Sequence, residues 1–126
     1  MSVVLDTSAV LAVIRREDGR ERVIEVLSQA IASTVNYAEV IGNLVMRGMP
    51  VAVAKAQFDG LRISTVLFDE PQALEAGSLR RFSHHRQLSL GDRACLALAR
   101  LRDVPVMTTD RVWRTLDLGV EVHIVR

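Results

Sequence analysis

The chain has 126 residues, of which 49% are hydrophobic, 25% are charged and only 4% are aromatic. This balance predicts one globular domain over residues 1–126 and excludes a disordered chain or an aromatic stacking platform for single-stranded nucleic acid. The formal net charge is +1, and Lys55 is the only lysine among the 16 basic residues. Arginine suits phosphate contacts, although a GC-rich genome would give the same bias.

Cysteine content and hydropathy limit the class of protein further. The single cysteine, Cys95, excludes a disulfide framework and a cysteine-rich zinc site. The longest stretch without charge, Val26 to Ala38, covers 13 residues, which is shorter than the roughly 18–20 that a membrane helix needs. The N-terminus has no basic region, and Asp6 interrupts its apolar run, so no signal peptide is expected. The expected location is the cytoplasm.

Hydrophobic patterning predicts strands and helices in alternation. Strands are expected at 1–5, 31–35, 63–68, 104–107 and 121–125, and the 63–68 strand is expected to be buried. Helices are expected at 7–16, 20–30, 36–47, 50–58, 71–82 and 90–102, with a loop at 84–88 and a short helix after Asp110. This order predicts an α/β fold in three layers, in which a parallel sheet is flanked by helices on both faces. Ligands of such sheets bind outside the carboxyl ends of the strands.

Four acidic residues are expected at that edge. Asp6 and Asp110 follow the first and fourth strands, while Glu39 and Asp92 are expected in the first turns of two helices. Each has an ordinary explanation as a helix cap, with Asn36–Glu39 and Ser89–Asp92 spaced as capping boxes. Together, however, four carboxylates repel one another unless a cation neutralises them.

The chemistry of these ligands indicates which cation. Carboxylates without cysteine or nearby histidine ligands favour Mg²⁺ or Mn²⁺, and such ions at an open sheet edge suit phosphate esters. If four acids are committed to metal, 11 remain against 16 basic residues, and the balance of +5 favours a polyanion.

Other chemistries lack their residues. A phospho-receiver or a haloacid-dehalogenase-type phosphatase needs a lysine at this edge, whereas Lys55 is expected inside a helix, and no phosphate-binding glycine loop is present. His84 and His85 are interpreted as a solvated pair in a loop. The remaining candidates are interpreted as structural residues: Cys95, Trp113 and His123.

Four segments carry a resemblance to a known family: 4–8 (VLDTS), 33–39 (STVNYAE), 88–97 (LSLGDRACLA) and 108–113 (TTDRVW). In this order and at this length, they resemble a PIN-domain ribonuclease, specifically a VapC-type toxin of bacterial toxin–antitoxin pairs. The resemblance covers nearly the whole chain. It implies endonucleolytic cleavage of RNA, a Mg²⁺ or Mn²⁺ site, a homodimer and a cognate antitoxin.

The predicted site residues follow from both arguments. Asp6 and Asp92 are expected to bind the metal directly, and Glu39 and Asp110 to complete the site directly or through water. Four neighbouring side chains are candidates to orient the carboxylates or to contact phosphate: Thr7, Ser8, Thr108 and Arg93. The alternative for each is an ordinary structural role. The first helix carries apolar residues at helical spacing, namely Val10, Leu11 and Ile14. They are interpreted either as a contact surface for the antitoxin or as part of the core.

Two alternatives remain open. One is a PIN-domain nuclease of RNA processing that is not a toxin. The other is a non-catalytic module whose acidic edge binds a basic peptide.

Overall fold

The computed structural model describes residues 1–82 and 88–126. Within them, five strands form one parallel sheet in the order β3-β2-β1-β4-β5. The strands are β1 (Val3–Leu5), β2 (Ala30–Ser33), β3 (Ser64–Val66), β4 (Val106–Thr108) and β5 (Val122–Ile124). β1 is central and is buried along its whole length, as its uninterrupted apolar sequence predicts.

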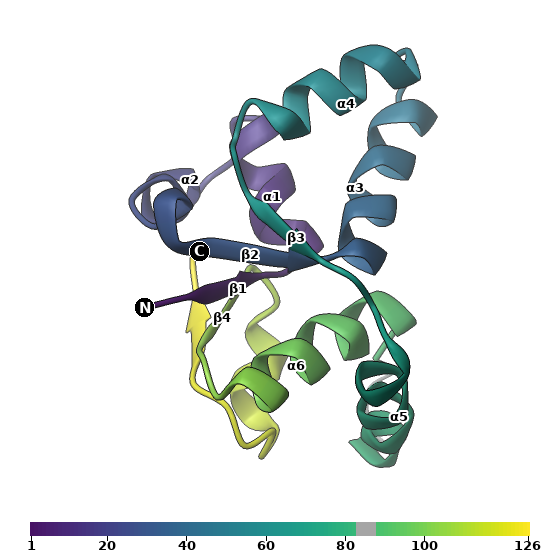
Figure 1. Ribbon diagram of the computed structural model, residues 1–126. Coiled ribbons are helices and arrows are strands. Elements are labelled where there is room, and N and C mark those ends of the chain that lie inside the picture. The colour runs from purple at the N-terminus through teal and green to yellow at the C-terminus, as the bar shows by residue number, and fades with distance from the viewer. Residues whose placement is uncertain (83–87) are drawn as a thin grey trace.

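Helices cover both faces of the sheet, which confirms the predicted three-layer α/β fold (Figure 1). The α-helices are α1 (Thr7–Ile14), α2 (Arg20–Ile24), α3 (Thr34–Met46), α4 (Val51–Asp59), α5 (Glu70–Ser78) and α6 (Leu90–Arg102). Short 3₁₀ helices are η1 (Leu27–Gln29), η2 (Leu79–Phe82) and η3 (Arg111–Thr115). Helices α1 to α4 lie on one side of the sheet, and α5 and α6 lie on the other (Figure 1).

Each face of the sheet has its own apolar core. Leu5 and Val40 belong to the core beneath α1 to α4, whereas Val4 and Leu96 belong to the core beneath α5 and α6. Successive residues of β1 therefore point to opposite faces, as the pleat of a strand requires.

Several residues with predicted structural roles lie in these cores. Trp113 and Cys95 are fully buried, which confirms both as packing residues. Val10 and Leu11 are also core residues of α1, so they offer no surface to a partner, while Ile14 is partly buried against the same core.

The second strand–helix unit differs from the sequence prediction. The helix expected at 20–30 ends at Ile24, and Ala30 already belongs to β2, where it pairs with Val3 of the central strand. Helix α3 begins at Thr34 rather than at Asn36, because the Ser33 side chain caps it by accepting from the Val35 N–H at 3.1 Å. The β-branched pair Thr34–Val35 favours a strand, but the cap prevails.

The third strand is also different from its prediction. β3 spans only Ser64–Val66 and lies at one edge of the sheet, with Ser64 and Thr65 exposed. The expectation of a buried strand was wrong, because a clustered sequence pattern does not say how many neighbours a strand will have. None of the helices in the described residues is both long enough and apolar enough to span a membrane.

Candidate metal centre

The topology places the first and fourth strand ends next to each other. β1 pairs with β4 in the register Leu5–Met107, and the Asp6 N–H donates to the Met107 carbonyl at 3.0 Å. The residues that follow β1 and β4 therefore share the carboxyl edge of the sheet, as predicted.

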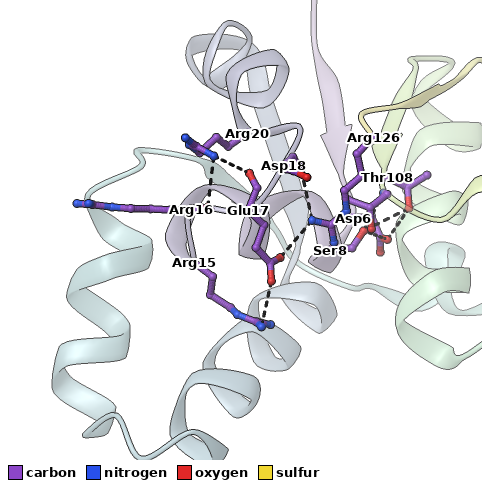
Figure 2. A network of polar contacts seen from close by, with 10 residues as sticks. Asp6, Ser8, Arg15, Arg16, Glu17, Asp18, Arg20, Thr108 and Arg126 are labelled. Carbon is purple, nitrogen blue, oxygen red and sulfur yellow. Dashed lines mark hydrogen bonds and ion pairs between the residues drawn. The ribbon is translucent and has the colours of Figure 1, made fainter.

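Asp6 is buried at this edge, with 4% of its surface exposed. It precedes α1, yet its side chain makes no capping hydrogen bond. Its carboxylate instead accepts from the Ser8 and Thr108 hydroxyls, each at 2.9 Å (Figure 2). The capping explanation is therefore wrong for Asp6.

The protonation of Asp6 reflects this environment. Burial is the largest cause, and the charge of Asp92 adds to it, so that the pKa of Asp6 rises from 3.8 to about 7. The hydrogen bonds from Ser8 and Thr108 oppose this rise. A buried carboxylate facing a second one is stabilised in its charged form by a cation.

Asp92 reaches the same edge from α6. It forms a complete capping box with Ser89, in which each side chain accepts from the other residue's N–H, at 3.0 and 3.1 Å. The predicted cap is confirmed, and it coexists with electrostatic contact to Asp6. Burial raises the pKa of the Cys95 thiol, and the charges of Asp6, Asp92 and Glu39 raise it further.

Glu39 lies in the second turn of α3 and not in the first, because α3 begins two residues earlier than predicted. Its carboxylate accepts from the Thr7 hydroxyl at 2.6 Å and from the Asn36 amide at 3.4 Å. The capping box expected for Asn36 and Glu39 was therefore wrong, since Ser33 is the cap.

Asn36 and Gly91 join α3 to α6, and both were missed as site residues. The Asn36 amide is fully buried and donates to the Thr7 hydroxyl at 3.0 Å and to the Gly91 carbonyl at 3.1 Å. A β-carbon at Gly91 would lie 2.0 Å from Glu39 Oε1, so only glycine leaves room for this carboxylate. A glycine in the first turn of a helix, where it costs stability, was the available signal.

Asp110 occupies the edge in a different manner. Its carboxylate caps η3 by accepting from the Val112 N–H at 3.1 Å, which confirms the capping interpretation. Its own N–H donates to the Thr108 hydroxyl at 3.0 Å, and Thr108 in turn donates to Asp6. Asp110 is thus joined to Asp6 through one hydroxyl.

The smaller candidate residues divide into two groups. Thr7, Ser8 and Thr108 donate to carboxylates of the site and so orient them. The Arg93 guanidinium donates to the Leu88 carbonyl at 3.3 Å and the Ala76 carbonyl at 3.2 Å, and so braces α6 against α5.

The other sequence candidates lie away from this edge or outside the description. Lys55 lies in α4 as predicted, paired with Asp59 at 2.5 Å. His123 lies in β5 with Glu121 at 3.4 Å. His84 and His85 fall outside the described residues.

The described donors suit a hard cation with few protein ligands. Within residues 1–82 and 88–126, no three acidic, histidine or cysteine side chains are close enough to form a complete cage. Mg²⁺ keeps several waters and commonly binds through one or two carboxylates, so the coupled pair Asp6 and Asp92 fits it.

A family model described as "PIN domain" matches residues 3–118. The chain belongs to the PIN-domain family. The match covers all five acidic and amide positions of the site described above, Asp6, Asn36, Glu39, Asp92 and Asp110. A search of curated proteins gives no significant match.

Solved structures with the same PIN fold cover nearly the whole chain. A DNA-bound VapBC from Salmonella typhimurium has a TM-score of 0.79 at 19% identity over 100% of this chain and 99% of that one. VapBC2 from Rickettsia felis, bound to a promoter DNA fragment, has a TM-score of 0.79 at 15% identity over 100% of both chains. VapBC-5 from Mycobacterium tuberculosis, a member of the VapBC family of toxin–antitoxin systems, has a TM-score of 0.63 at 24% identity over 100% and 99%.

Proposed function

We propose that this PIN domain is a metal-dependent endoribonuclease and the toxin of a type II toxin–antitoxin pair. The observation that carries the nuclease proposal is the buried Asp6 carboxylate, which faces the charge of Asp92 at the carboxyl edge of the sheet. The VapBC structures with the same fold support the toxin role. The cytoplasm, where RNA is present, is the proposed location.

In this proposal, Asp6 and Asp92 hold Mg²⁺ or Mn²⁺, and Glu39 and Asp110 complete the site through water. When bound, the ion supplies a positive charge against the phosphate oxygens and makes a water molecule easier to deprotonate. The hydroxyls of Ser8 and Thr108 keep Asp6 aimed at the edge. Thr7 and Asn36 do the same for Glu39.

An apolar groove supports the proposed antitoxin partner. It lies between α3 and α4, has a volume of about 540 Å³ and is lined by Tyr37, Ala38, Ile41, Gly42, Val45, Val51, Ala52 and Lys55. Val51 is 64% exposed and Val45 is 44% exposed. Such a surface favours an apolar segment of a partner protein. A homodimer also remains a proposal, to be tested by analytical ultracentrifugation.

Cleavage of a defined RNA tests the enzymatic proposal. The purified chain is expected to cut RNA at internal positions in Mg²⁺ or Mn²⁺ and to stop when a chelator is in excess. Full cleavage in chelator, by a preparation free of contaminating nuclease, contradicts the metal site. A non-catalytic acidic module would instead bind a basic peptide with or without metal.

Expression in a bacterial host tests the toxin role separately. Growth arrest that is relieved by the adjacent gene's product, and copurification of that product, are expected. An active nuclease that causes no arrest and retains no small partner would be an RNA-processing PIN domain instead.

A further inference from the structure

Four arginines surround a pocket at the carboxyl edge, outside the acidic site. A pocket of about 320 Å³ is lined by Arg22, Arg111, Arg114, Ile124, Val125 and Arg126. Each of the four arginines is exposed. They come from α2, from η3 and from the end of β5, so the fold brings together side chains that are far apart in the sequence.

The backbone holds three of these guanidinium groups in place. Arg22 donates through Nη1 to the Ile124 carbonyl at 2.6 Å, and Arg111 donates through Nε to the main-chain oxygen of Arg126 at 2.9 Å. Arg126 donates through Nη1 to the Asp18 carbonyl at 3.4 Å (Figure 2). A guanidinium has five N–H donors, so each of these contacts leaves most of them available to a ligand. Arginines fixed in this manner lose less entropy on binding an anion than free ones do.

The positive charge of the pocket is largely uncompensated. Among the described residues, no aspartate or glutamate side chain forms an ion pair with Arg22, Arg111 or Arg114. Arg126 is 3.6 Å from Glu17, which also pairs with Arg15 at 3.0 Å (Figure 2). Three guanidinium groups that lack aspartate or glutamate partners in the described part of the chain surround one pocket, and they repel one another until an anion enters.

The pocket lies beside the acidic site. Ile124, at the end of β5, pairs in register with Thr108, which donates to Asp6. Arg111 directly follows Asp110, whose carboxylate fixes the start of η3. A strand running past the acidic site toward this corner would meet the arginines next.

We propose that the pocket formed by Arg22, Arg111, Arg114 and Arg126 binds a backbone phosphate of the RNA, next to the phosphate that is cleaved. The proposal rests on the proposed ribonuclease function. Phosphate matches the pocket because its oxygens accept several charge-assisted hydrogen bonds from guanidinium groups at once. The adjacent cleavage site favours a nucleic acid as the occupant over an acidic protein.

Binding of a fluorescent single-stranded RNA 12-mer, measured by anisotropy in excess chelator, tests the proposal without turnover. The Arg111→Gln/Arg114→Gln variant is expected to bind on the order of tenfold more weakly at low salt. Because the pocket is proposed to hold one phosphate, its loss also reduces the slope of log affinity against log salt by about 0.7. In Mg²⁺, the same variant is expected to raise KM and leave kcat unchanged, as for a positioning contact.

A matched control carries the same change of charge elsewhere. Arg47 and Arg102 are exposed. Arg47 follows the 13-residue helix α3, Arg102 is the last residue of the 13-residue helix α6, and both helices begin at the carboxyl edge. They therefore lie roughly 20 Å from that edge. Arg47→Gln/Arg102→Gln is expected to retain the affinity and salt dependence of the parent.

Each outcome decides for or against the pocket. If the Arg111/Arg114 variant binds like the parent, or no more weakly than the Arg47/Arg102 control, the proposal is overturned. It is also overturned if polyglutamate of equal length binds the parent more tightly than RNA does and depends on the same arginines. Among the described residues, no hydrogen bond or ion pair involves the Arg114 side chain, so Arg114→Gln alone is expected to fold like the parent and separates lost binding from misfolding. If the arginine variant loses RNA binding but the parent chain never cleaves RNA, the proposed nuclease activity is refuted and the proposed phosphate pocket is retained.

Discussion

Asp6 and Asp110 begin from nearly the same position in the sequence and end in different environments. Each follows a strand of the central pair β1 and β4, and each precedes a helical turn. Asp6 is buried, makes no cap and accepts two hydroxyl hydrogen bonds, whereas Asp110 is half-buried and caps η3. The two residues therefore share a position after a strand end, but the surrounding side chains determine whether the carboxylate is buried or caps a helix.

The largest expected effect is on cleavage. Asp6→Asn and Asp92→Asn are each expected to reduce RNA cleavage on the order of a hundredfold or more, because each weakens charge stabilisation worth several kcal/mol. The double variant should be scarcely worse than either single one, since both residues act as one unit. Initial rates in Mg²⁺ measure this effect.

The matched control for these variants is Asp59→Asn, which removes a carboxylate from the exposed pair with Lys55 in α4. It should cleave like the parent. If Asp92→Asn also cleaves at the parent rate, Asp92 serves only as the cap of α6 and the assigned metal centre is wrong.

The next largest effect is on the pH dependence of metal-free stability. Between about pH 4 and 7, the folded chain keeps a proton on Asp6 that the unfolded chain releases, because folding raises the pKa of this carboxyl from 3.8 to about 7. The free energy of unfolding should therefore fall as pH rises through this window, by up to about 4 kcal/mol. Denaturant titrations in chelator at pH 5, 6, 7 and 8 measure the slope.

Asp6→Asn should remove most of this slope, since asparagine does not titrate. At pH 8 the variant should have a higher free energy of unfolding than the parent. Asp110→Asn should keep the slope of the parent. A parent whose stability does not change between pH 5 and 8 would contradict the environment described for Asp6.

A smaller effect is expected at the cap. Asp110→Ala should lower the free energy of unfolding by about 1 kcal/mol, because the Val112 N–H loses its acceptor. Asp110→Asn should remain within a few tenths of a kcal/mol, since asparagine caps equally well. If both variants also cleave like the parent, Asp110 is a cap alone, and the contrast with Asp6 becomes complete.

The smallest change in stability is expected at Gly91. Gly91→Ala places a β-carbon where the Glu39 carboxylate lies and should turn that side chain out, which lowers cleavage severalfold. The helix gains up to about 1 kcal/mol from alanine, which offsets the lost Thr7 contact. Gly77→Ala in α5, where a β-carbon meets nothing within 4 Å, should gain stability without loss of cleavage. Equal cleavage by both variants would show that Glu39 is dispensable.

The sequence alone determined the parallel sheet, the layers of helices and the edge at which the acids gather. Those features follow from apolar runs, caps and strand–helix alternation, which are local properties that each segment carries with it. The Ser89–Asp92 capping box was predictable for the same reason, since both partners lie within one turn.

Tertiary structure decided the rest, because it depends on which segments become neighbours. The start of β2 at Ala30 is set by its pairing with Val3, and the exposure of β3 by its place at the sheet edge. Asn36 changes from an expected cap to a buried bridge only because α6 brings the Gly91 carbonyl to it. The rise in the pKa of Asp6 and the arginine pocket arise in the same way, since burial and the gathering of like charges are properties of the assembled fold.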